Sequence, residues 1–296
     1  MGDYNVLGID PASSKLSTVF DGTSFHEVPP GSLRDVVCAS PDTLICWDAP
    51  LTGPPDEVES IYEGDLCTRV VEKYLGGGVV RWSQRPAGAW RPQRGSAPPK
   101  APAGISVLGF AGLTHWTISR RTLGLPRVGP FDAALTELPA RLITEGGAQP
   151  PAPDERRPSV VEVHPAVALW LWRAPNGRTT WLYKRDGDVL RDVWGELKAV
   201  LYPLAEQHPQ LKAGMEAASD TPGVSDDHLD AFIAWALGLL WTRQAADQPA
   251  VVLLGDARTG AMLVPLCELT SFDLGAAFAR SIAGANERAR NHGEDS

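Results

Sequence analysis

The hydrophobic pattern of the first fifty residues predicts three strands, a short helix and a fourth strand. Apolar or alternating runs predict strands over residues 4–10, 16–20, 24–28 and 43–47. The Asp21-Gly22 pair between the second and third runs is typical of a hairpin turn. Ser32 suits the N-cap of a helix over residues 33–39. This order predicts an antiparallel meander, followed by a crossover that places residues 43–47 parallel to the first strand.

Helical periodicity dominates the rest of the chain. Helices are predicted over residues 56–75, 105–123, 131–145, 188–206 and 226–244, with another starting at Pro165. Further strands are predicted over residues 159–163, 250–255 and 261–265. Residues 84–103 carry Pro and Gly at a density that no regular element tolerates, which predicts a long loop. We therefore expect one α/β domain over residues 1–285, with an insertion at 84–103 and a polar tail at 286–296.

Composition fits a cytoplasmic α/β protein. The 296 residues are 43% hydrophobic and 21% charged, which is enough apolar material for one large core. No apolar run approaches the ~18 residues that would span a bilayer, and the N-terminus lacks the pattern of a signal peptide. Four scattered cysteines without a CxxC pair argue against a disulfide scaffold and a structural zinc site.

Charge is unevenly distributed along the chain. The net charge is −9, yet residues 73–131 contain nine Lys and Arg and no Asp or Glu. Such segregation predicts a basic surface on an otherwise acidic protein. This surface could contact nucleic acid, or it could pair with acidic neighbours within the protein.

Five acidic residues are the candidates for chemistry. Asp10, Asp48 and Glu162 end or occupy apolar strands, and a carboxylate removed from water costs several kcal/mol unless it is compensated. A divalent metal ion is one compensation, because hard cations prefer carboxylate oxygen. Asp227 and Asp230 are three residues apart on a predicted helix and so share one face of it. That face would bring both acids towards the strand ends.

Each of these residues also has a structural interpretation. An aspartate that ends a strand often only forms a turn, and acids in the first turn of a helix stabilise its dipole. Asp230 lies beyond that first turn, so the dipole explains little of it. Glu162 could pair with a buried arginine. His164 and His228 lie beside the acids, and each could be a metal ligand, a proton shuttle or a structural histidine.

Short motifs in a fixed order give the chain a family resemblance. They are GID at 8–10, WDAPL at 47–51, VEVHP at 161–165, DDHLDA at 226–231 and LVP at 263–265. With these motifs the chain resembles the domain of unknown function 429 family (DUF429), described as predicted nucleases with an RNase H-like fold. The fold implied is α/β: a mixed central sheet, with an antiparallel three-strand meander plus parallel strands, flanked by helices. RNase H and the Holliday-junction resolvases share it, and the resolvases' DxxDA pattern falls on Asp227, Asp230 and Ala231.

The sequence departs from the family at two places. The family usually has a Gly-rich turn after the second acid, whereas this chain continues from Asp48 as Ala-Pro-Leu-Thr-Gly. The Pro- and Arg-rich insertion at 84–103 has no counterpart that we can place.

The resemblance implies a metal-dependent nuclease. Two Mg²⁺ or Mn²⁺ ions ~4 Å apart would drive phosphodiester hydrolysis, with Asp10 bridging them. Asp48 and Glu162 would complete one metal site, and Asp227 with Asp230 the other. Residues of the basic segment would contact phosphates and stack on bases of DNA or RNA. The candidates for these contacts are Arg81, Arg85, Arg91, Arg94, Trp82 and Trp90.

Two other functions remain open. An actin-like or sugar-kinase-type phosphotransferase would share the fold, but it needs a Gly-containing phosphate turn after the first acid. Here Asp10 is followed by Pro-Ala-Ser-Ser, and those proteins use two copies of the fold. The second alternative is a non-catalytic binding or scaffold protein that keeps the acids for folding or metal-linked stability. The choice between DNA, RNA and a small phosphoester, and the oligomeric state, are also open.

Overall fold

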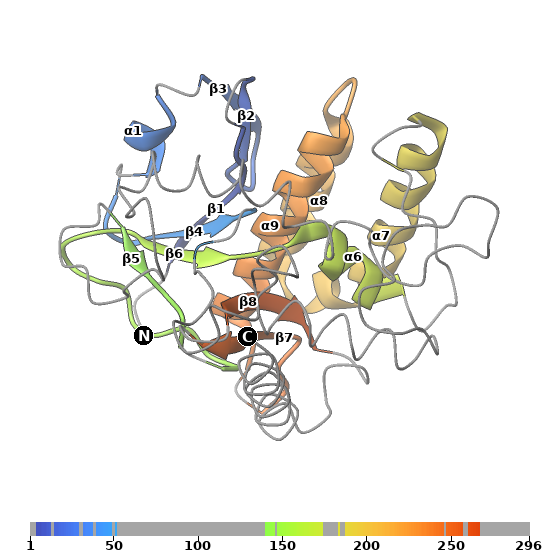
Figure 1. The fold of residues 1–296 in the computed structure, drawn as a ribbon. Helices are drawn as coiled ribbons and strands as arrows, with labels where there is room; N and C mark the ends of the chain where they lie inside the picture. The colour runs from blue at the N-terminus through green and yellow to red at the C-terminus, as the bar shows by residue number, and fades with distance from the viewer. Residues whose placement is uncertain are drawn as a thin grey trace, which may run out of the picture.

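Six strands form one mixed sheet, and a long helix crosses one face of it (Figure 1). The computed structural model describes residues 4–12, 15–29, 32–37, 40–48, 51, 140–145, 147–173, 183, 187–245, 247–256 and 260–266. The strands of the sheet are β1 (Asn5–Asp10), β2 (Ser17–Phe20), β3 (Phe25–Val28), β4 (Thr43–Trp47), β5 (Arg141–Leu142) and β6 (Ser159–Glu162). Two more, β7 (Val251–Asp256) and β8 (Gly260–Pro265), form an antiparallel pair.

The sheet has the order β3-β2-β1-β4-β6-β5. β1, β2 and β3 are antiparallel, whereas β4 runs parallel to β1, and β6 runs parallel to β4. This confirms the predicted meander and crossover. The predicted turn is also present: the Asp21 carboxylate accepts hydrogen bonds from the amides of Thr23 and Ser24, and Gly22 has a φ of 92°.

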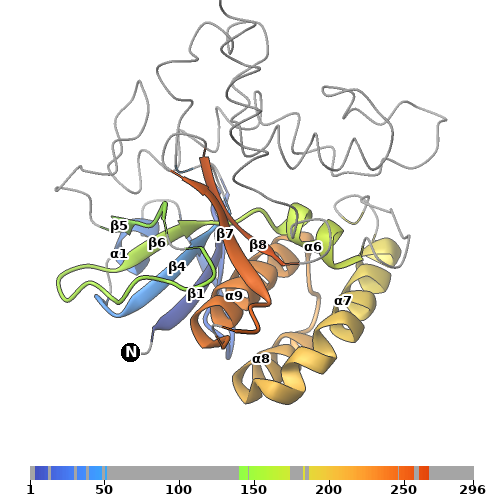
Figure 2. The same ribbon diagram turned by 90° about the horizontal axis from the view of Figure 1, so that it is seen from below.

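Helices cover both faces of the sheet. They are α1 (Leu33–Val37), α6 (Pro165–Arg173), α7 (Gly187–Gln207), α8 (Pro209–Asp220) and α9 (Asp226–Arg243). α9 lies against the sheet, and α6, α7 and α8 lie on the same side (Figure 2). On the other face, Leu33 of α1 joins a core cluster with Ile9, Ile45 and Trp47. Among the helices of the described residues, none has the length and apolar character to cross a membrane.

Strand alternation divides the core into two clusters. Val6, Leu44 and Cys46 face α9, whereas Ile45, which lies between Leu44 and Cys46, and Leu7, which follows Val6, belong to the cluster on the α1 side. Side chains of adjacent strand residues point to opposite faces of a sheet. The two clusters therefore identify the face to which each candidate acid belongs.

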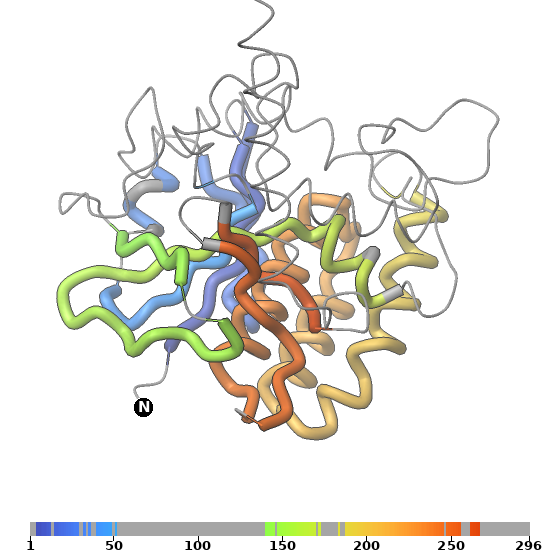
Figure 3. The backbone as a smooth tube through the Cα atoms, turned by 60° about the horizontal axis from the view of Figure 1, so that its bottom comes forward, coloured from blue at the N-terminus to red at the C-terminus, as the bar shows by residue number. Residues whose placement is uncertain are grey.

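Two glycines allow α9 to approach the sheet closely. A Cβ added at Gly8 of β1 would lie 2.1 Å from the carbonyl oxygen of Ala231 and 2.4 Å from the amide nitrogen of Trp235. Farther along α9, a Cβ on Gly238 would lie 2.3 Å from Sγ of Cys46. Because no side chain separates β1 from α9, the helix backbone rests directly on the strand. In the tube view α9 lies alongside the blue strands of the sheet, next to the β7–β8 pair (Figure 3).

The irregular segment 147–158 is joined to the end of α9 and to β7. The Trp241 indole and the Leu253 amide both donate to the carbonyl oxygen of Gly147. The Gln244 side chain donates to the carbonyl oxygens of Ala148 and Val251. These bonds connect the loop before β6, the long helix and the β7–β8 pair.

Two parts of the fold differ from the predictions. The helix predicted over 131–145 is wrong over residues 140–145, where Arg141 and Leu142 form a strand that pairs with β6; residues 131–139 lie outside the described part. Residues 141–142 are a strand because they pair with β6: the amides of Arg141 and Ile143 donate to the carbonyl oxygens of Pro158 and Val160. Helix α8 was not predicted at all. The predicted helices 56–75 and 105–123 and the loop 84–103 also lie outside the described residues.

Candidate functional site

Asp10 and Asp48 end neighbouring parallel strands at the same edge of the sheet. β1 and β4 pair with Ile9 opposite Trp47, and the Asp48 amide donates to the carbonyl oxygen of Ile9 at 3.0 Å. Asp10 and Asp48 each follow a residue of this aligned pair. Both acids are half-buried, so the register brings two carboxyl-bearing residues side by side at one sheet edge.

A row of polar residues extends from Asp10 across the meander. Asp10 lies opposite Thr18, and Thr18 lies opposite Glu27. Residues directly opposite each other in antiparallel strands have side chains on the same face. The Thr18 hydroxyl donates to Oε1 of Glu27 at 3.1 Å. Phe20 is two residues from Thr18 and Phe25 is two residues from Glu27, so each phenylalanine lies on the same face as its polar neighbour. Both phenylalanines pack in the core cluster that faces α9, which places the polar row on that face too.

Glu162 belongs to the opposite face. It pairs in register with Trp47, which packs in the α1 core together with Leu51. The Glu162 side chain is buried, and its Oε2 accepts a hydrogen bond of 2.7 Å from the Leu51 amide. Glu162 thus holds Leu51 in place. By strand alternation its side chain lies on the face of the sheet opposite that of Asp10.

Asp230 lies fully buried in the second turn of α9, and Tyr183 bonds to it. The Tyr183 hydroxyl donates to Oδ1 of Asp230 at 2.7 Å, and both side chains are inaccessible or nearly so. Burial raises the pKa of Tyr183 well above its ordinary value, and the negative charges of Asp230, Asp48 and Asp10 raise it further. Three of the five predicted acids therefore contribute negative charge that raises the pKa of the Tyr183 phenol.

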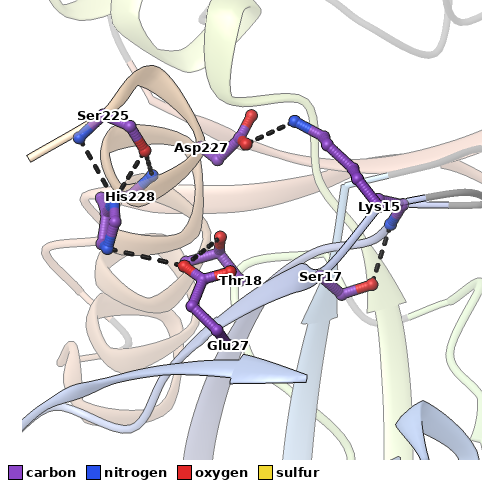
Figure 4. A network of polar contacts seen from close by, with 8 residues as sticks. Lys15, Ser17, Thr18, Glu27, Ser225, Asp227 and His228 are labelled. Carbon is purple, nitrogen blue, oxygen red and sulfur yellow. Dashed lines mark hydrogen bonds and ion pairs between the residues drawn. The ribbon is translucent and has the colours of Figure 1, made fainter. Parts of the chain in front are cut away.

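Asp227 has a different partner. Its Oδ2 forms an ion pair with Nζ of Lys15, which lies between β1 and β2 (Figure 4). Partial burial alone would lower the pKa of Lys15. The hydrogen bond to Asp227 and the charges of Asp227, Asp10 and Asp226 outweigh burial, so the pKa is raised. Lys15 is therefore held protonated beside the predicted site.

His228 links the first turn of α9 to β3. Its Nδ1 accepts from the amide of Ser225 at 3.2 Å and lies 2.6 Å from the Ser225 hydroxyl, while the Ser225 hydroxyl accepts from the His228 amide. Its Nε2 lies 3.6 Å from Oε1 of Glu27 (Figure 4). With Nδ1 accepting, a neutral ring carries its proton on Nε2, towards Glu27. His228 thus caps the helix and joins the polar row. The carbonyl oxygen of His164 accepts the amides of Val167 and Ala168 at the start of α6.

Oxygen donors of the kind that Mg²⁺ and Mn²⁺ prefer are present at this edge of the sheet. Asp10, Asp48 and Asp230 supply them, and their combined effect on Tyr183 locates them around one hydroxyl. Within the described ranges, no three His, Cys, Asp or Glu side chains lie close enough together to form a metal site. The type of donor, but not its arrangement among the described residues, is that of a site for a hard divalent cation.

Three residues of this site were not predicted from the sequence. Tyr183 lies in a segment without hydrophobic periodicity, and Glu27 looks like an ordinary exposed residue of a hairpin strand. Lys15 lies outside the basic segment at 73–131 from which the positively charged candidates come. Its position five residues after Asp10, in the loop beyond a strand that ends in a carboxylate, was the available signal. The six predicted substrate-contact residues, Arg81, Arg85, Arg91, Arg94, Trp82 and Trp90, lie outside the described residues.

Comparison with known proteins gives one match. A family model described as a protein of unknown function (DUF429) matches residues 85–253, more than half of the chain. This range contains Glu162, Asp227 and Asp230, whereas Asp10 and Asp48 precede it. Neither a curated protein nor a solved structure matches the chain.

Proposed function

We propose that this chain, which belongs to the DUF429 family of proteins of unknown function, is a metal-dependent phosphodiester hydrolase acting on nucleic acid. The proposal includes an RNase H-like fold. A three-strand antiparallel meander, parallel strands beside it and a helix that carries Asp227 and Asp230 across the sheet support this fold.

One arrangement carries the proposal: Asp230 accepts the hydrogen bond of the buried Tyr183 hydroxyl, and Asp10 and Asp48 end neighbouring parallel strands and contribute to the raised pKa of that hydroxyl. The three acids come from two parallel strand ends and a helix, which are rigid elements. Asp230 is fully buried. Carboxylate oxygens are the ligands that hard divalent cations prefer, and in this proposal Asp10, Asp48 and Asp230 would hold Mg²⁺ or Mn²⁺.

A bound divalent cation would act as a Lewis acid on a phosphoryl oxygen and would lower the pKa of a bound water. The protein supplies the rest. The close contact at Gly8 sets the height of Asp230 above the sheet, and the Glu162–Leu51 bond holds the segment after Asp48. His228, with Nε2 directed at Glu27, joins the start of α9 to the polar row. Glu162 is thereby a positioning residue in this proposal, and not a metal ligand.

The proposed substrate is nucleic acid because of the charge pattern. Nine positive charges without a compensating acid lie in residues 73–131, and clustered Lys and Arg provide most of the non-specific affinity for a phosphate backbone. The arginines and tryptophans predicted to contact substrate belong to this segment. Salt-dependent binding is the expected signature of such contacts.

The test is an assay of Mn²⁺-dependent cleavage. The full-length protein is incubated with single-stranded, duplex and branched DNA and RNA, with Mn²⁺ or with a chelator. The variants Asp10→Asn and Asp230→Asn should lose cleavage by at least about 100-fold, the order expected when a charge-stabilising group is removed from an active site. Asp192→Asn, an exposed aspartate of α7, is the control and should match the parent. Circular dichroism confirms that each variant is folded.

Two results would overturn the proposal. If the parent cleaves none of these substrates with Mn²⁺, the protein is not a nuclease. If the parent binds Mn²⁺ through Asp10 and Asp230 but shows no cleavage, the binding or scaffold function is the better explanation. Cleavage that persists in both variants would place the activity elsewhere in the chain.

A further inference from the structure

The loop between β1 and β2 carries two neighbouring side chains, Lys15 and Leu16, that the proposed chemistry does not use. They follow Asp10, the last residue of β1, and precede Ser17, the first residue of β2. The Ser17 hydroxyl accepts a hydrogen bond of 2.9 Å from the Ala12 amide, which joins the two ends of the loop. Because the loop begins where Asp10 ends its strand, it lies at the same edge of the sheet as the candidate site.

The ammonium of Lys15 is held in place and yet accessible. It pairs with the carboxylate of Asp227 in the first turn of α9, so the loop is joined to the helix (Figure 4). The Lys15 side chain is 61% exposed, whereas that of Asp227 is 26% exposed. A lysine ammonium has three donor hydrogens, more than one ion pair needs. A phosphate oxygen can therefore reach this ammonium from solvent.

Leu16 presents an apolar side chain to solvent beside that ammonium. Among the residues that the structure describes, the exposed large hydrophobic side chains are Leu16, at 47%, and Tyr202, at 56%. Tyr202 belongs to α7, whereas Leu16 is at the edge where the strands end in acids. The loop thus offers a positive charge and an apolar contact side by side.

This pair of contacts suits a base-paired nucleic acid. Lys side chains bind the phosphate backbone, and exposed leucines of DNA-binding proteins enter between neighbouring base pairs as wedges. The carboxylates of Asp10 and Asp48 repel a polyanion at this edge. Lys15 supplies a positive charge beside them, so that a backbone can approach.

Resting on the proposed function, we propose that the β1–β2 loop binds duplex nucleic acid, in addition to the basic segment at 73–131. Lys15 exchanges its ion pair with Asp227 for a phosphate oxygen, and Leu16 enters the base stack. The exchange costs little, because an exposed ion pair contributes little to stability. The loop would hold the duplex against the edge of the sheet where Asp10 and Asp48 lie.

Binding in the presence of a chelator tests the phosphate contact without metal or cleavage. Fluorescence anisotropy of a labelled DNA duplex is measured at several salt concentrations with the full chain, Lys15→Met and Lys15→Arg. Lys15→Met should reduce the salt slope of the logarithm of the binding constant by about 0.9, the value for one phosphate contact. Lys15→Arg keeps the charge and should keep the slope. Lys212→Met, exposed on α8, is the matched control and should bind like the parent.

Asp227→Asn tests the exchange. In the parent it releases the ammonium and should tighten duplex binding by about two- to fivefold, the range for an exposed ion pair. In the Lys15→Met background it removes a negative charge but releases no ammonium, so the gain should be smaller. The difference between the two gains is the coupling of Asp227 with Lys15 in binding.

A fluorescent adenine analogue in the duplex, whose emission rises when it is unstacked, tests the wedge. The parent should raise this emission, and Leu16→Ala should abolish the rise without changing the salt slope. Tyr202→Ala, at the other exposed large hydrophobic residue, is the control and should behave like the parent. Circular dichroism confirms that each variant is folded.

The outcomes separate this proposal from the proposed function. A parent that binds the duplex with a slope that a folded Lys15→Met shares would overturn the loop contact and leave the hydrolase standing. Emission that does not rise, or that rises equally with Leu16→Ala, would overturn the wedge. A parent that binds no nucleic acid would overturn the loop contact together with the proposed substrate.

Discussion

The Tyr183 hydroxyl donates a hydrogen bond of 2.7 Å to Oδ1 of Asp230, and both side chains are buried. This contact connects Tyr183, which is in none of the helices and strands that the structure describes, to the helix that crosses the sheet. It also places a titratable phenol in the negative field of Asp10 and Asp48. The bond is therefore both a support for Asp230 and a probe of the charge at the site.

Replacing Tyr183 with Phe should destabilise the fold at neutral pH. The variant leaves a buried carboxylate oxygen without its hydroxyl donor, which costs about 1–3 kcal/mol of unfolding free energy. Urea denaturation at pH 7 measures the loss. Tyr202→Phe is the control, because Tyr202 is 56% exposed and should change the free energy by less than about 0.5 kcal/mol. Equal effects of the two substitutions would contradict the proposed support of Asp230.

Alkaline pH should reduce the advantage of the parent over Tyr183→Phe. The pKa of Tyr183 is raised in the folded protein, whereas in the unfolded chain it lies near its ordinary value of about 10. The stabilisation is complete below that unfolded pKa and is lost as pH rises towards the folded pKa, at about 1.4 kcal/mol per pH unit. Urea denaturation of both proteins at several values above about pH 9 measures the difference, and a difference that stays constant with pH would refute it.

The two substitutions Glu162→Gln and Glu162→Ala should separate positioning from metal binding. Glutamine keeps an oxygen that can accept from the Leu51 amide, so its unfolding free energy and Mn²⁺ affinity should remain near those of the parent. Alanine removes the buried acceptor and should cost about 1–3 kcal/mol. Thermal unfolding and Mn²⁺ titration provide the measurements. If glutamine lowers Mn²⁺ affinity as much as Asp10→Asn does, Glu162 is a metal ligand.

Gly8→Ala should separate α9 from β1. The added methyl group would lie 2.1 Å from the Ala231 carbonyl oxygen, and overpacking of this kind costs about 1–3 kcal/mol. Mn²⁺ affinity should fall with stability, because the same helix carries Asp230. Gly195→Ala in α7 is the matched control: its Cβ would meet nothing within 4 Å, and Ala favours the helix by ~1 kcal/mol. A neutral Gly8→Ala would show that the helix can shift at little cost.

The elements with strong local patterns could be predicted from the sequence. The strand ending at Asp10, the Asp21-Gly22 turn and the apolar helix from Asp226 each carry an alternating or helical pattern with a recognisable boundary. Strand β5 could not be predicted, since two residues have no pattern of their own and become a strand only through pairing with Ser159 and Val160.

The acids of the site could be predicted from local patterns, whereas their partners could not. The strand ends identified Asp10 and Asp48, and helical spacing identified Asp230. The side of the sheet that Glu162 occupies depends on its register with Trp47, and register is a property of two paired strands. The partners Tyr183 and Lys15 come from segments without periodicity. Only their tertiary contacts reveal that they belong to the site.

The Lys15–Asp227 ion pair joins residues that are 212 positions apart, and this separation has a consequence for biosynthesis. Asp10 and Asp48 leave the ribosome long before α9, so the acids of the first strands stay hydrated while the intervening chain is made. Contacts of such high sequence separation form late, after the entropy of closing the loop has been overcome. The charged centre therefore comes into existence only when the nascent chain is nearly finished, and an interrupted translation product would lack it.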